Sequence, residues 1–290
     1  LVNNSLAYLQ ELAAFHRRQL KIPIIGITGS NGKTTTKELV SRVLGKKFNV
    51  FSTVGNLNNH IGVPLSVLSI GKKDEIAVIE MGANHPEEID FLCNIAQPGF
   101  GIITNIGKAH IGEAGGLDEI IKMKSELYQH IGKVNGKVFV NADNPLLVTI
   151  ATGIDSIQYS SHTISSCKGS IIESFPFLKM EWNGKRINTR LIGDINFENA
   201  LASICIGTWF GVDEESIISA IESYIPDNNR GQYVAKTPHD NTLILDAYNA
   251  NPTSMEAMLS CFMKWRNGNA GNKTVILGEM LELGQYAIKE

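Results

Sequence analysis

Short apolar runs alternate with amphipathic stretches along most of this chain. Apolar residues recur every third position from Leu6 to Phe15 and follow candidate capping residues at positions 3–5, which predicts a helix. The apolar run Ile22–Ile27 then predicts a short strand. A glycine-rich turn follows it, and the amphipathic stretch Lys33–Leu44 predicts a second helix. The chain therefore opens with a helix and a strand–loop–helix unit.

The same alternation is repeated toward the middle of the sequence. It predicts strands over Ile76–Glu80, Gly101–Ile106 and Lys137–Asn141, and helices over Pro86–Ile95 and Leu117–Ile131. Strands that alternate with helices in this way favour an α/β fold, with a mostly parallel sheet flanked by helices on both faces.

Residues 152–193 show a different pattern. Short alternating strands meet there at turns such as Asn183-Gly184, which predicts a small antiparallel side sheet. Two helices are expected afterwards, near 196–210 and 213–224. The antiparallel part therefore lies between the parallel sheet and a helical region.

A second α/β unit is predicted after a hinge. In Pro226–Asn229 three turn formers follow a proline and end the helical pattern. A new cycle then begins, with a strand over Thr242–Asp246, a helix over Pro252–Trp265 and a strand over Lys273–Leu277. We therefore expect one domain over 1–228 and the beginning of another over 229–290. The chain begins without an initiator methionine and stops just after a predicted strand, so both ends are expected to continue in a longer protein.

Composition and charge exclude several classes of function. The chain has 26 Lys+Arg and 29 Asp+Glu, a net charge of −3, which gives no reason to expect a nucleic-acid partner. Its 43% hydrophobic and 19% charged residues suit a chain that buries a core. No apolar run approaches the roughly 18 residues of a membrane span. The four cysteines are widely spaced and show no metal-binding pattern, which favours a reducing, cytoplasmic compartment.

A candidate phosphate-binding loop joins the first predicted strand to the next helix. It reads Gly29-Ser30-Asn31-Gly32-Lys33-Thr34-Thr35. Backbone N–H groups, the helix N-terminus and Lys33 can surround phosphate oxygens, and the Thr34 hydroxyl can reach Mg²⁺. The strict spacing of such loops would place a further glycine at Ile27, so this is a variant. The alternative is a glycine-rich turn beside a solvated lysine.

The stretch Ile27–Lys37 resembles the ATP-binding loop of the Mur ligases. Four later stretches strengthen the resemblance and favour the branch of that family that handles a D-alanyl-D-alanine dipeptide: Gly55–Pro64, Glu80–Pro86, Asn105–His110 and Asp246–Pro252. The resemblance runs from the first helix to Gly284 and covers nearly the whole chain.

The resemblance implies a fold and an activity. Such ligases have a UDP-binding domain, a central P-loop ATPase domain and a C-terminal Rossmann-like α/β domain; this sequence matches the second and the first part of the third. The implied reaction joins D-alanyl-D-alanine to UDP-N-acetylmuramoyl tripeptide through an acyl phosphate made from ATP, in the bacterial cytoplasm, by a monomer. Alternatives are another Mur-type or folylpolyglutamate-type ligase, or a P-loop module that binds nucleotide without ligating.

The resemblance also implies catalytic and metal-binding residues. Lys33 would stabilise phosphoryl charge. Thr34, Glu80 and His110 would bind two Mg²⁺ ions, and Glu80 ends a predicted strand, where open α/β sheets place their ligands. Lys124 matches the family lysine that reacts with CO₂ to form a carbamate, for which burial and a lowered pKa are expected. A solvated acid, a loop histidine and a surface lysine are the ordinary alternatives.

Three further groups complete the implied site. Asn196 and Asn199 would contact the adenine, although asparagines are also common helix caps. Arg230 and Asp246, which would otherwise be surface charges near a hinge, would reach the nucleotide when the domains close. Asn56, Asn58 and Asn59 would line the path of the peptide substrate, although asparagine is also frequent in turns.

Overall fold

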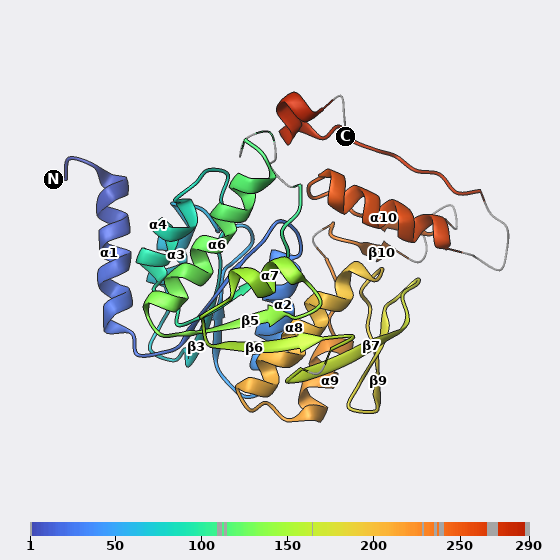
Figure 1. Ribbon diagram of the computed structural model, residues 1–290, viewed down its shortest axis with the longest axis horizontal. Helices are drawn as coiled ribbons and strands as arrows, with labels where there is room; N and C mark the ends of the chain where they lie inside the picture. Colours follow the sequence, from blue (N-terminus) through green and yellow to red (C-terminus); the bar gives the residue numbers. More distant parts are fainter. Residues whose placement is uncertain are drawn as a thin grey trace.

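A nine-stranded sheet forms the centre of the protein (Figure 1). The computed structural model describes residues 2–108, 112, 115–163, 165–227, 229–234, 237, 241–265 and 272–287. The sheet has the order β2-β3-β1-β4-β5-β6-β7-β8-β9. Its strands are β1 (Ile24–Thr28), β2 (Val50–Ser52), β3 (Ile76–Glu80), β4 (Phe100–Ile103), β5 (Lys137–Asn141), β6 (Ser156–Ser160), β7 (Cys167–Glu173), β8 (Lys179–Trp182) and β9 (Lys185–Asn188).

The strand directions confirm the predicted fold class. Every pairing from β2 to β7 is parallel, and β7, β8 and β9 pair antiparallel. The predicted turn connects β8 to β9. Asn183 and Gly184 both have positive φ, as the two central residues of a type I′ hairpin turn require. The antiparallel strands continue the main sheet, because β7 also pairs with β6.

Helices cover both faces of this sheet. One face carries α1 (Ser5–Gln19), α3 (Gly62–Ser69), α4 (Glu88–Ala96), α6 (Leu117–Lys133) and α7 (Pro145–Ile150). The other face carries α2 (Lys33–Leu44), α8 (Ile195–Trp209) and α9 (Glu214–Glu222). Within β1, Ile24 packs on the face that carries α1, whereas Ile25 and Ile27 pack on the face that carries α2. This alternation is the two-residue period of a strand buried on both faces.

Several predicted elements differ from the structure at their ends. Helix α4 begins at Glu88, two residues after the predicted start, and α6 extends to Lys133. The short helices α3 and α7 were not predicted, because eight and six residues are too few to show a helical period. No helix in the described part of the chain is long and apolar enough to cross a membrane.

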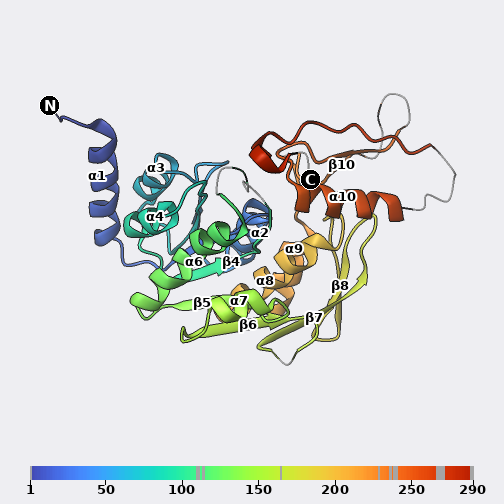
Figure 2. The ribbon, with the colours of Figure 1, turned by 45° about the horizontal axis from the view of Figure 1, so that its top comes forward.

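The C-terminal segment, from Asn229 onward, lies against the same edge of the sheet as the phosphate loop (Figure 2). It contains β10 (Gln232–Val234) paired antiparallel with β11 (Leu243–Leu245), helix α10 (Pro252–Lys264) and the 3₁₀ helix η1 (Leu281–Tyr286). The aromatic rings of Phe175 and Phe177, between β7 and β8, contact Trp265 and Tyr233. These contacts connect the C-terminal segment to the antiparallel strands.

The predicted strand over Lys273–Leu277 is wrong. These residues have no regular secondary structure, and Ile276 is 92% exposed. An apolar run becomes a strand only where another backbone pairs with it, and β10 and β11 pair with each other instead. The predicted boundary between 1–228 and 229–290 stays a prediction.

Candidate active site

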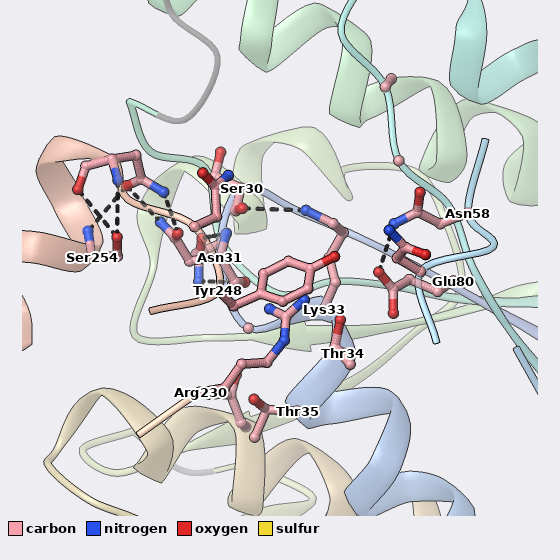
Figure 3. A pocket seen from close by; sticks show the side chains of 18 of the residues that line it. Ser30, Asn31, Lys33, Thr34, Thr35, Asn58, Glu80, Arg230, Tyr248 and Ser254 are labelled. Carbon is pink, nitrogen blue, oxygen red and sulfur yellow. Dashed lines mark hydrogen bonds between the residues drawn. The ribbon is translucent and has the colours of Figure 1, made fainter. Parts of the chain in front are cut away.

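A cavity of about 460 Å³ lies at the carboxyl ends of β1, β3 and β4 (Figure 3). Parallel pairing places Ile27 beside Glu80 and Thr28 beside Ile103, so the loops after these three strands meet. Most of the residues predicted as functional line this cavity: Ser30, Asn31, Gly32, Lys33, Thr34, Thr35, Asn56, Asn58, Asn59, Glu80, Asn196, Asn199, Arg230 and Asp246. Open α/β sheets bind ligands at this edge.

Two glycines give the phosphate loop its shape. Gly29 has a φ of +143°, and a Cβ there would lie 2.0 Å from the Thr104 hydroxyl oxygen. Gly32 has a φ of +78°, and its Cβ would lie 2.6 Å from Asn199 Oδ1. Neither position tolerates a side chain, because the backbone conformation and the space both exclude one. The backbone can therefore turn closely around a ligand at the start of α2.

Lys33 lies at the first position of α2 and curls back over the phosphate loop (Figure 3). Its Nζ donates to the carbonyl oxygens of Gly29, at 2.8 Å, and Ser30, at 3.2 Å. The first N–H groups of an α-helix have no partner within the helix, so those of α2 can bind an anion together with this ammonium. Thr34 and Thr35, in the same first turn, also line the cavity.

Glu80 is a buried carboxylate whose two oxygens differ in their hydrogen bonding. It is 1% exposed, and its Oε1 accepts a hydrogen bond from Asn58 Nδ2 at 2.8 Å. Its Oε2 accepts none from the described residues, and Lys37 Nζ lies 3.9 Å away. A buried charged oxygen without a hydrogen bond is costly unless a cation satisfies it. Glu80 and the Thr34 hydroxyl face the same cavity, which fits Mg²⁺ held by few protein ligands together with phosphate oxygens.

Replacing Asn58 with alanine tests whether this amide positions Glu80. We expect the Mg²⁺ concentration for half-maximal ADP formation to rise about tenfold, as when other residues that orient metal ligands are removed. Asn94, an exposed asparagine on α4, supplies the matched control Asn94→Ala. An unchanged Mg²⁺ requirement with lower turnover would instead indicate that Asn58 acts on the substrate.

Lys124 is buried behind the cavity wall. It lies on α6, is 3% exposed and donates from Nζ to the Ala83 carbonyl oxygen at 3.1 Å. Burial, helped by the positive charge of Lys33, lowers the pKa of Lys124 to about 7. The expected burial and lowered pKa are confirmed. The neighbouring Lys122 is 70% exposed and pairs with Glu119 at 3.5 Å.

The lowered pKa of Lys124 predicts a pH dependence of folding. The folded chain releases this proton near pH 7 and the unfolded chain near pH 10.5, so stability rises with pH across that window. The free energy of unfolding of Lys124→Met minus that of wild type should therefore be larger at pH 7 than at pH 10, by on the order of a few kcal/mol. Urea unfolding at both values in CO₂-free buffer measures this difference. A difference that stays constant with pH would contradict it.

Asn196 and Asn199 link α8 to α2. Asn199 Nδ2 donates to Asn196 Oδ1 at 3.1 Å, and its Oδ1 accepts from the Thr36 hydroxyl at 3.1 Å. Neither residue is the cap of α8, which is Asp194, so the capping alternative is not what the structure shows. Both side chains line the cavity, and their contact with adenine stays a prediction.

Arg230 and Asp246 reach the cavity from the C-terminal segment. The Arg230 guanidinium stacks on the Tyr248 ring, with Cζ 3.5 Å from its centroid, and Arg230 Nε is buried with no hydrogen-bond partner among the described residues (Figure 3). Asp246 Oδ1 accepts from the Gly231 N–H at 3.0 Å. Although Asp246 keeps an exposed surface, partial desolvation by the surrounding chain raises its pKa. The stacking partner Tyr248 was missed, although the Asp246–Pro252 stretch contains it.

A contact between Asn31 and Asn251 was also missed. Asn251 caps α10, and its Nδ2 donates to Asn31 Oδ1 of the phosphate loop at 2.7 Å. The sequence Asn251-Pro252 signals a helix start, but a local pattern does not reveal a partner 220 residues away. The C-terminal segment is thereby joined to the phosphate loop itself.

The three asparagines of the predicted peptide path differ in their contacts. Asn59 Oδ1 accepts from the N–H groups of Ile61 and Gly62, so it is a turn-forming residue at the start of α3. Asn58 holds Glu80, and Asn56 is exposed. All three line the cavity, and their contact with substrate stays a prediction. His110 lies outside the described residues.

The sequence family described as the Mur ligase middle domain matches residues 27–207. The chain belongs to the Mur ligase family. The matched range of this Mur ligase contains the phosphate loop, Glu80, Lys124 and both asparagines of α8, and ends before Arg230 and Asp246.

Relatives with names include enzymes and solved structures. The UDP-N-acetylmuramoyl-tripeptide–D-alanyl-D-alanine ligase of Bacillus subtilis is 36% identical over 98% of this chain and 62% of its own length. A crystal structure of MurF from Acinetobacter baumannii superposes with a TM-score of 0.89 at 32% identity, covering 100% of this chain and 64% of its own. MurF ligase from Thermotoga maritima in complex with ADP gives a TM-score of 0.84 at 28% identity. The chain thus spans less than two thirds of the first two relatives.

Proposed function

We propose that this chain is the ATP-binding part of a ligase that joins D-alanyl-D-alanine to UDP-N-acetylmuramoyl tripeptide in the bacterial cytoplasm. The observation that carries the proposal is a single cavity that combines the phosphate loop, the unsatisfied Glu80 oxygen and the Arg230 guanidinium. The named relatives with this activity support the choice of substrates. We propose a monomer, since one chain supplies all of these groups.

The proposed reaction has two steps. A carboxylate oxygen of the tripeptide attacks the γ-phosphorus of ATP, and ADP leaves to give an acyl phosphate. The dipeptide amine then attacks the acyl carbon; the C–N bond forms, phosphate leaves and the amine loses a proton. Negative charge grows on phosphoryl oxygens in the first step, where Lys33 and the α2 N-terminus stabilise it. Arg230 lies across the cavity and would stabilise the same charge.

Mg²⁺ would neutralise the phosphate charges, and two ions are proposed. Thr34 and Glu80 would hold the first, and His110 would contribute to the second. Lys124 is proposed to carry a carbamate: its neutral amine adds to CO₂, an N–C bond forms and a proton is released. The lowered pKa of Lys124 supports this step, because only the unprotonated amine is nucleophilic. The resulting anion would orient a metal ligand.

The first experiment measures ADP formation with Mg²⁺-ATP, tripeptide and dipeptide, each omitted in turn. It is run on this chain and on the full-length gene product. ADP that appears only when all components are present supports ligation by the full-length protein. ADP that forms without the acceptors would support a nucleotide-hydrolysing module, and a response to glutamate instead of dipeptide would support a folylpolyglutamate-type ligase.

A further inference from the structure

A second cavity, of about 290 Å³, adjoins the first on its Glu80 side. Asn59, His60, Gly82 and Glu88 line both cavities. Four residues line only the second: Pro86, Glu87, Phe91 and Leu92. It is therefore a side branch of the cleft in which the proposed acyl phosphate would form.

The walls of this side cavity have two kinds of surface. Pro86, Phe91 and Leu92 form an apolar part, and Phe91 is 41% exposed. Glu87 and Glu88 supply carboxylates, and no lysine or arginine is among the described residues that line the cavity. Asn59 and His60 add an amide and an imidazole on the part of the wall shared with the main cavity. An apolar wall with acidic groups suits an alkyl chain that ends in an ammonium group, since the stem is buried while the charge is neutralised.

The backbone around the cavity does not favour an anion. The N–H groups of Glu87 and Asp90, at the start of α4, already donate to the two oxygens of Glu126, at 2.7 and 2.9 Å. Glu88 Oε2 likewise accepts from the N–H groups of Asn84 and His85, at 2.8 and 3.2 Å. The donors that attract anions at a helix N-terminus are thus occupied by carboxylates of the chain itself. A ligand carboxylate would meet like charge and no free donor from these groups.

The position of the side cavity specifies which part of a substrate could reach it. The carboxylate that receives the phosphoryl group must lie beside Lys33 and Glu80. The side chain of the same amino acid starts one carbon away from that carboxylate, so it leaves the reaction centre toward Gly82 or back into the main cavity. Gly82, two residues after Glu80, lines both cavities. The side cavity is therefore the space next to the reaction centre that could hold the side chain of the activated residue.

We propose that this side cavity binds the side chain of the third residue of the tripeptide and favours an aminoalkyl chain, as in lysine, over one that also ends in a carboxylate, as in diaminopimelate. The inference rests on the proposed function and deepens it. Glu87 is the specificity-determining residue, because it lines the side cavity and not the main one.

The test compares two tripeptides, one ending in lysine and one in diaminopimelate, as substrates of the full-length gene product. We expect kcat/KM for ADP formation to be about tenfold higher with the lysine tripeptide. Glu87→Gln should reduce this preference about fivefold through KM for the tripeptide, as expected for loss of one partly exposed ion pair. Glu87→Lys should reverse it. Glu11→Gln, which removes an exposed carboxylate on α1, is the matched control and should change neither value.

The outcomes separate the two proposals. No ADP with either tripeptide would overturn the proposed function. ADP formation with equal kcat/KM for both tripeptides, or a preference that Glu87→Gln leaves intact, would overturn the side-cavity inference alone. A change in KM for the dipeptide instead of the tripeptide would assign the cavity to the attacking amine, and would also overturn it.

Discussion

Replacing Lys33 with methionine should reduce ADP formation about a thousandfold, at the upper end of the loss seen when one preorganised donor is removed from a transition state. Its ammonium group lies within hydrogen-bond distance of two carbonyl oxygens of the phosphate loop, at 2.8 and 3.2 Å. Methionine keeps an unbranched side chain that is one atom shorter, and it removes the charge and the donors. The loss is expected mainly in kcat, because the charge on the phosphoryl group grows as the reaction proceeds.

Lys122→Met is the matched control for this variant, since it removes a lysine that is 70% exposed and outside the cavity. ADP formation by that variant should stay within a factor of about two of wild type. Thermal unfolding of both variants checks that the fold is kept. A Lys33→Met protein that folds and still turns over at the control rate would contradict the role of the phosphate loop.

Replacing Lys124 with methionine should lower ADP formation about a hundredfold while nucleotide binding is retained. The reason is the proposed carbamate, whose negative charge methionine cannot supply. Lys124 does not line the cavity and instead donates to the carbonyl oxygen of Ala83, which does. A loss of turnover without loss of nucleotide affinity is therefore the expected signature.

The carbamate also predicts a dependence of the wild-type enzyme on CO₂ and pH. Because the pKa of Lys124 is about 7, the neutral amine gains population between pH 6 and pH 8, and activity in limiting bicarbonate should rise over this interval. Removing CO₂ should lower wild-type activity and leave Lys124→Met unchanged. Small carboxylates should partly restore the variant. Equal responses of both proteins to CO₂ would contradict carbamate formation.

The strands and the helix that carry this candidate site were predicted from local sequence. The run Ile22–Ile27 and the glycines after it contain their own signal, because a buried strand and a tight turn each depend on neighbouring residues. The placement of Glu80 follows from the same logic, since it ends a strand of the parallel sheet. The order of the parallel strands then brings these ends together without any further information.

Contacts between distant segments could not be predicted in this way. Asn58 holds Glu80 across 22 positions, and Asn251 holds Asn31 across 220. Asparagine occurs in turns, caps and binding sites alike, so its role is decided by the partner it meets. The failure at Lys273–Leu277 has the same origin, because strand pairing is a property of two segments. The side cavity at Glu87 likewise arises only when α4 and the loop before α3 are placed together.

The burial of β1 determines how the phosphate loop behaves over time. All five residues of β1 are buried, and the strand pairs with β3 on one side and with β4 on the other. Its amide hydrogens can exchange with solvent only when the whole sheet opens, so they should be among the slowest to exchange in the chain. The loop is thus attached to the most persistent element of the fold, whereas Arg230, Asp246 and Asn251 come from a segment with two short strands. If these residues hold the nucleotide as proposed, local opening of that segment would release it while the phosphate loop keeps its conformation for the next one.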